Sequence, residues 1–80
     1  TKLSDTEFVF SARLEVDYIN DEYNLNLPES DNYSTLSGLI YQSHESIPEK
    51  GEIIEIEDFV FTIRKVSHNR IEEVHIRVNK

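Results

Sequence analysis

Carboxylates are the most plentiful groups in this 80-residue sequence that could do chemistry, with 16 Asp and Glu against 8 Lys and Arg. They are dense in residues 17–22, where a helical spacing of four makes neighbours, and again in residues 52–58. Mg²⁺ prefers oxygen ligands and often takes only one or two carboxylates plus waters. The candidate ligands for a weakly bound divalent cation are Asp17, Asp21, Glu55, Glu57 and Asp58. The alternative is that these acids only form solvated faces, which is the usual role of charge runs.

Other reactive residue types occur without the spacing that their chemistry needs. His44, His68 and His75 fall at a predicted helix end, in a turn and in a strand, so they share no zinc-ligand spacing. The segment LSGLI is not the G-x-S-x-G turn of a nucleophilic serine, and EKGE lacks the glycine run of a phosphate loop. There is no cysteine. We therefore predict a non-catalytic protein with no cofactor beyond a weakly bound divalent cation.

Charge and hydropathy narrow the classes of partner. The formal net charge is −8 at pH 7, whereas contact with phosphate groups needs a basic surface, so we expect neither nucleic acid nor anionic lipid as a partner. No apolar stretch approaches the roughly 18 residues of a spanning helix, so we expect no direct membrane insertion. Residues 1–58 hold fourteen acids and three bases, and residues 59–80 hold two acids and five bases. This imbalance fits either solvated faces or an acidic face that attracts a cation or a basic partner.

In the first half of the chain, the spacing of the apolar residues changes from that of a strand to that of a helix. Residues 7–14, EFVFSARL, alternate apolar and polar side chains, which predicts a half-buried strand. Val16, Ile19 and Tyr23 are then spaced three and four apart, which predicts one face of a short helix with its aspartates near the outer face. Residues 24–32, NLNLPESDN, are rich in turn formers and predict a loop.

A second helix is predicted over residues 35–44, with a cap from Asp31, Asn32 or Ser34 and an end before Pro48. Its apolar face consists of Leu36, Leu39 and Ile40. Gly38 costs about 1 kcal/mol relative to alanine inside a helix. Such a glycine is often retained where a neighbouring element packs close to the backbone, so we expect a close contact there.

Three strands complete the chain. Residues 52–57 and 59–66 alternate apolar and polar side chains, and the connection Glu57-Asp58 between their apolar positions predicts a tight hairpin in which Asp58 tolerates a positive φ. A second turn follows at SHNR, where Asn69 suits a left-handed position.

The last predicted strand covers residues 71–79. Ile71 is out of phase with the alternating apolar residues that follow it, which predicts a bulge near residues 72–73. The element order is β-α-α-β-β-β. It predicts one α+β domain over residues 1–80, with two helices packed on one mostly antiparallel sheet.

Two short motifs occupy the middle of the chain. They are Tyr33, Thr35, Leu36, Gly38, Leu39 and Ile40, followed by Ile47, Pro48, Gly51 and Glu52. In this order they resemble the signature of the CorC/HlyC transporter-associated domain, roughly Y-x-T-[LI]-x-G-[LI]-[IVL] and then I-P-x-x-G-[DE]. The flanks FVFSARLEVDYINDEYNLNLP and FVFTIRKVSHNRIEEVHI resemble the family's opening and closing segments. The chain departs at Ser37 and Asp58, where the family commonly has glycine, and at Ser46, where it often has a basic residue.

The resemblance implies a C-terminal module of a longer membrane protein, on the cytoplasmic face of the cell membrane. In such proteins it follows a pair of CBS domains attached to a membrane domain linked to magnesium and cobalt efflux, and they are often labelled hemolysin-like. The domain is thought to modulate ion transport rather than perform it. Its fold resembles a subdomain of FAD-binding oxidases of the PCMH type. Because 80 residues are too few to enclose a flavin, binding of flavin adenine dinucleotide is a fold analogy only.

Two hypotheses from different classes follow. In the first, the domain regulates transport by docking on the CBS-domain pair and membrane domain of its parent chain. In the second, it senses a divalent cation directly through the five carboxylates named above. A sensor should gather several carboxylates around one point, whereas a docking module should expose an apolar or tyrosine patch. An uncovered strand edge could also pair two copies into a homodimer.

Overall fold

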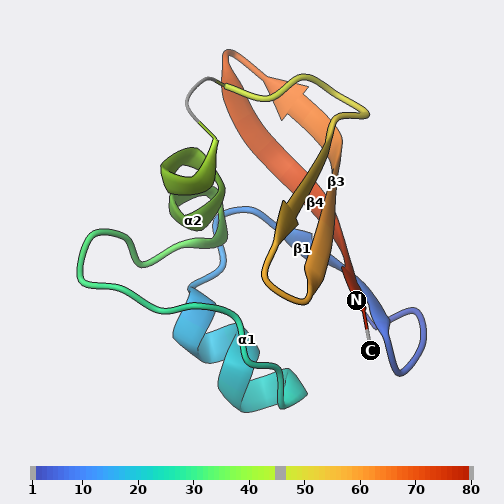
Figure 1. The fold of residues 1–80 in the computed structure, drawn as a ribbon. Helices are drawn as coiled ribbons and strands as arrows, with labels where there is room; N and C mark the ends of the chain where they lie inside the picture. The colour runs from blue at the N-terminus through green and yellow to red at the C-terminus, as the bar shows by residue number, and fades with distance from the viewer. Residues whose placement is uncertain (1, 45–46, 80) are drawn as a thin grey trace.

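A four-stranded sheet carries both helices on one of its faces (Figure 1). The computed structural model describes residues 2–44 and 47–79, so Ser46 lies outside the described residues. In chain order the elements are β1 (Glu7–Ser11), α1 (Val16–Tyr23), α2 (Leu36–Ser43), β2 (Ile53–Ile56), β3 (Phe59–Ser67) and β4 (Arg70–Val78). The predicted α+β class and element order are confirmed. Within the described residues, neither helix is long and apolar enough to cross a membrane.

The strand order is β1-β4-β3-β2, and all three neighbouring pairs are antiparallel. In the β2–β3 hairpin Ile56 pairs with Phe59, so the turn has two residues as predicted. The positive φ of 54° belongs to Glu57, however, and not to Asp58. The expectation for Asp58 was therefore wrong. Two-residue hairpin turns that match the strand twist need a positive φ at their first central position, and the register places Glu57 there.

The β3–β4 hairpin follows the prediction more closely. Both central residues of its turn, His68 and Asn69, have positive φ values of 53° and 60°. Further along, the register shifts so that Glu72 has no partner in β3, and Ile71 and Val74 are both buried although they are three residues apart. The extra residue in β4 explains why Ile71 looked out of phase, and it confirms the predicted irregularity near residues 72–73.

The core lies between the inner face of the sheet and the two helices (Figure 1). Its most completely buried members from the strands are Phe8, Phe10, Phe61, Ile63, Ile71, Val74 and Ile76. The helices contribute the apolar faces that their spacing predicted, namely Val16, Ile19, Leu36, Leu39 and Ile40. Tyr23 closes one end of the core, since its ring stands edge-on to Phe10 with centroids 4.9 Å apart.

The two helices begin side by side, although about twenty residues separate their starts. The amide of Val16 donates to the Ser34 carbonyl at 2.8 Å, and the amide of Leu36 donates to the Leu14 carbonyl at 2.9 Å. This bridge holds Thr35 extended, and its hydroxyl accepts from the Gly38 amide at 3.2 Å. The N-cap is therefore Thr35, and the expectation that Asp31, Asn32 or Ser34 caps the helix was wrong. The long-range bridge, and not local turn chemistry, decides where α2 begins.

Candidate functional site

The five carboxylates considered as cation ligands lie in three separate places. Asp17 and Asp21 are exposed on α1, Glu55 is exposed on β2, and Glu57 with Asp58 forms the β2–β3 turn. Among residues 2–44 and 47–79, no group of three or more Asp, Glu, His or Cys is placed to hold a metal ion. The cation hypothesis thus finds no preformed cluster in the part of the chain that is described, and it stays a prediction.

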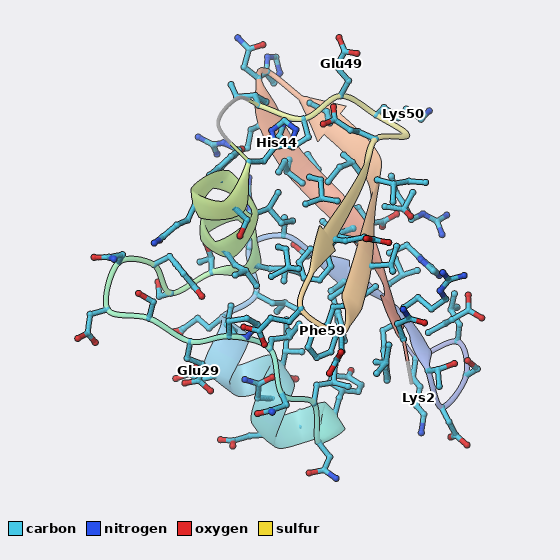
Figure 2. The ribbon with its side chains drawn as sticks, viewed as in Figure 1. Lys2, Glu29, His44, Glu49, Lys50 and Phe59 are labelled. Atoms are coloured by element: carbon cyan, nitrogen blue, oxygen red, sulfur yellow. The ribbon has the colours of Figure 1, made fainter. Side chains whose placement is uncertain are left out.

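Asp17 borders a small hollow of about 180 Å³ beside the loop that precedes α2. Glu29 also lines it, and its carboxylate accepts from the side-chain amide of Asn20 at 2.9 Å. Tyr33 closes the hollow, with its hydroxyl donating to the Pro28 carbonyl at 2.8 Å. Burial raises the pKa of Tyr33, and the charges of nearby glutamates raise it further. Figure 2 shows Glu29 on the loop beside α1. These contacts hold the loop against the helices.

The three histidines are dispersed, as their spacing predicted. His44 follows α2 and forms an ion pair with Glu52, just ahead of β2 (Figure 2). The amide of Glu49, and secondarily His44, lowers the pKa of the Glu52 carboxyl. His75 pairs with Glu7 at 3.0 Å, and His68 is exposed in the β3–β4 turn. Each histidine therefore has a separate local environment. The contact between His44 and Glu52 connects the end of α2 to the segment just before β2.

The face of the sheet opposite the helices carries a continuous mixed row. Val9, His75, Thr62 and Ile53 are register partners in turn, so they cross all four strands. We call these four residues the outer row. Ile53 is 64% exposed, the largest exposure among the large apolar side chains described, and the other three are partly buried. The sequence offered one signal for this surface: in consecutive Ile53 and Ile54 on a strand, one side chain must face away from the core.

The tyrosines do not form one patch with this row. Tyr18 on α1 is 48% exposed, and Tyr41 on α2 is 36% exposed. The Tyr41 hydroxyl accepts from the Ile71 amide at 3.1 Å. A docking module was expected to expose an apolar or tyrosine patch; the outer row exposes one large apolar side chain, Ile53, and the tyrosines lie apart on the helices.

Comparison with known sequences gives one family. A family model described as the transporter associated domain CorC_HlyC matches residues 1–80. A curated relative, the magnesium and cobalt efflux protein CorC of Salmonella typhimurium, is 26% identical over 77 residues. That match covers 96% of this chain but only 26% of the relative. The chain thus spans about a quarter of the length of the curated relatives that it matches.

Solved structures share the fold over nearly their whole length. A conserved protein of unknown function from Haemophilus influenzae has a TM-score of 0.86 at 27% identity, covering 98% of this chain and 95% of that one. The transporter associated domain of a CBS domain protein from Porphyromonas gingivalis has a TM-score of 0.83 at 23% identity. This match covers 100% of this chain and 97% of that one. A CorC_HlyC domain from a Xylella fastidiosa hemolysin, in complex with Mg²⁺ and Mn²⁺, has a TM-score of 0.80 at 19% identity. This match covers 100% of this chain and 96% of that one. The last two likenesses show the fold alone.

Proposed function

This chain belongs to the CorC_HlyC family of transporter associated domains, and we propose that it is a non-catalytic regulatory module of a CBS-domain membrane transporter. In this proposal residues 1–80 are one domain of a longer chain, on the cytoplasmic face of the membrane. Its partners are the CBS-domain pair and the membrane domain of that chain. The names of its relatives, which include magnesium and cobalt efflux proteins, support this setting.

The outer row is the observation that carries the docking proposal. Both helices pack on the other face of the sheet (Figure 1), and Ile53 presents most of its side chain to solvent. Burying apolar area is worth about 25 cal/mol per Å², so a partner that covers this row gains stability. A cation or nucleotide sensed by a neighbouring domain would then shift transport by favouring the docked or the undocked arrangement.

Binding of the domain to the CBS-domain pair of its own parent protein tests this proposal. Isothermal titration of the two pieces should show saturable binding that Ile53→Lys weakens at least about tenfold, because the lysine charge would have to be desolvated. Tyr18→Lys is the matched control, since it places the same charge at an exposed apolar side chain on α1. Equal losses in the two variants, or no binding, would show that the outer row is not the docking surface.

Direct cation sensing is the second candidate, and the metal complex of the Xylella fastidiosa domain favours testing it. Calorimetric titration of this domain with Mg²⁺, Ca²⁺ and Co²⁺ separates it from docking. Saturable binding at or below about millimolar, the weak end of the range for calcium sites, would support a sensor. That binding should be abolished by Asp17→Asn with Asp21→Asn, or by Glu55→Gln with Glu57→Gln and Asp58→Asn. Flat heats for all three ions would remove this candidate.

Pairing of two copies is a separate expectation. β2 is an edge strand of the sheet, so its outer side could accept a second strand. Antiparallel pairing of β2 with itself would bring Glu55 and its acidic neighbours together in both copies, which like-charge repulsion opposes. Sedimentation velocity over a range of concentrations distinguishes the monomer from the homodimer.

A further inference from the structure

A groove opens at the end of the domain where the N-terminal loop, the C-terminal end of α1 and the β2–β3 turn meet. It encloses about 690 Å³. Figure 2 shows Phe59 at the end of the hairpin above α1, and Lys2 on the terminal loop beyond it. The groove is lined by side chains from the inner face of the sheet, such as Phe59 and Val78, so it is a different surface from the outer row.

The floor of the groove is apolar. Phe59 and Val78 are only 5% and 8% exposed, and Tyr23 and Leu25 are partly buried against the core. The ring of Tyr23 is fixed by its edge-on contacts with two phenylalanines of β1. A bulky apolar side chain placed here would extend the core by burying the remaining area of these four residues.

The rim of the groove is acidic. Asp5, Glu57 and Asp58 line it, and Lys2 is the one basic residue among the lining residues described. Lys2 is already 3.4 Å from the Asp5 carboxylate. Within residues 2–44 and 47–79, neither Glu57 nor Asp58 takes part in an ion pair. The rim therefore attracts a cationic group and repels phosphate and carboxylate groups.

The acidic rim is also held in position. The Asn79 amide donates to the Asp58 carbonyl at 2.7 Å, and the Val78 amide donates to the Thr6 carbonyl at 2.8 Å. Glu57 has a φ of 54°, a conformation that glycine would adopt at lower cost. A glutamate at this position costs conformational energy, and it lines the groove from a turn that backbone hydrogen bonds hold in place. Such preorganisation reduces the entropy that binding must overcome.

From the apolar floor and the acidic rim we infer that this groove binds a short basic and apolar segment of another polypeptide. One bulky apolar side chain lies on the floor, and a Lys or Arg beside it lies between Glu57 and Asp58. A second copy of this chain does not fit this role. Of its basic residues, Arg64, Lys65 and Arg70 lie near the β3–β4 turn, at the opposite end of the domain from the groove (Figure 1), so a contact through them would run head to tail without closing. The inference does not depend on the docking of the outer row.

A capped pentapeptide, Lys-Leu-Lys-Phe-Lys amide, is the probe, and its neutral counterpart is Gln-Leu-Gln-Phe-Gln amide. Solved relatives consist almost entirely of this domain, so the 80-residue chain is a suitable folded unit for nuclear magnetic resonance. Titration of the ¹⁵N-labelled domain should move the amide signals of Leu25, Glu57 and Phe59 in a saturable way. The neutral peptide should bind roughly fivefold more weakly, and added salt should weaken the basic peptide alone.

Variants separate this site from general attraction to an acidic protein. Glu57→Gln with Asp58→Asn should weaken the basic peptide roughly fivefold. The matched control, Glu49→Gln with Glu55→Gln, removes two exposed charges away from the groove and should leave the affinity unchanged. Equal losses in the two double variants would overturn the inference. Signal changes centred on the aspartates of α1, or no saturation at millimolar peptide, would overturn it as well.

Discussion

Gly38 lies directly against Tyr33, because a Cβ added to the glycine would be 2.8 Å from the Cβ of the tyrosine. Real Cβ atoms are essentially never so close, so the loop before α2 can pack against the first turn of that helix only if residue 38 has no side chain. Tyr33 cannot easily move aside, since its hydroxyl is bound to the Pro28 carbonyl. This contact explains why a helix interior accepts a residue with poor helix propensity.

Gly38→Ala should destabilise the domain. Alanine gains about 1 kcal/mol in helix propensity, but overpacking against Tyr33 costs about 1–3 kcal/mol, so we expect a net loss of about 1 kcal/mol. Urea unfolding followed by circular dichroism measures the change. Gln42→Ala, at an exposed position of the same helix, should remain within about 0.5 kcal/mol of the parent. A Gly38→Ala variant more stable than the parent would contradict the close contact.

Thr35→Ala should cost about 1 kcal/mol, because the first turn of α2 then loses the hydroxyl that accepts from the Gly38 amide. Thr35→Ser keeps that oxygen and should restore most of the stability. Thermal unfolding of the two variants distinguishes a lost cap from a lost methyl group. If serine and alanine were equally destabilising, the hydroxyl would not be the group that matters.

The β2–β3 turn allows a paired test of the two residues between its strands. Glu57→Gly should stabilise the domain by about 0.5 kcal/mol, because relief of the left-handed strain slightly exceeds the entropy that glycine loses on folding. Asp58→Gly should instead cost about 0.5–1 kcal/mol, because that residue has no positive φ to relieve. Chemical denaturation of both variants gives the comparison, and the reverse ranking would contradict the observed turn.

Glu52 should contribute to the loss of stability in acid. Its folded-state pKa is lowered from the ordinary value of 4.5, first by the hydrogen bond from the Glu49 amide and then by His44. A lowered folded-state pKa means that the contribution is present above pH 4.5 and is lost as the pH falls through the lowered value. In Glu52→Gln the urea midpoint should therefore fall less steeply below that pH. His44→Gln should give an intermediate slope, and an unchanged slope in Glu52→Gln would contradict this role.

The local pattern of the chain was enough to predict much of the fold. Alternation and helical spacing identified the inward residues of every strand and helix, and the out-of-phase Ile71 located the irregularity in β4. These features are readable because burial on one face imposes a period on neighbouring residues. The motif around Gly38 likewise carried the resemblance to the family, and the structure shows a close contact at that glycine.

Long-range pairing decided what the local pattern could not. The register of β2 against β3 placed the positive φ on Glu57, and the bridge between the helix starts made Thr35 the cap. The candidate carboxylates, which form two groups in the sequence, lie in three separate places in the structure. The outer row draws one residue from each strand, and the groove draws on four segments distant in sequence. Such surfaces depend on which elements meet in space, and a periodic pattern within one element carries no information about its neighbours.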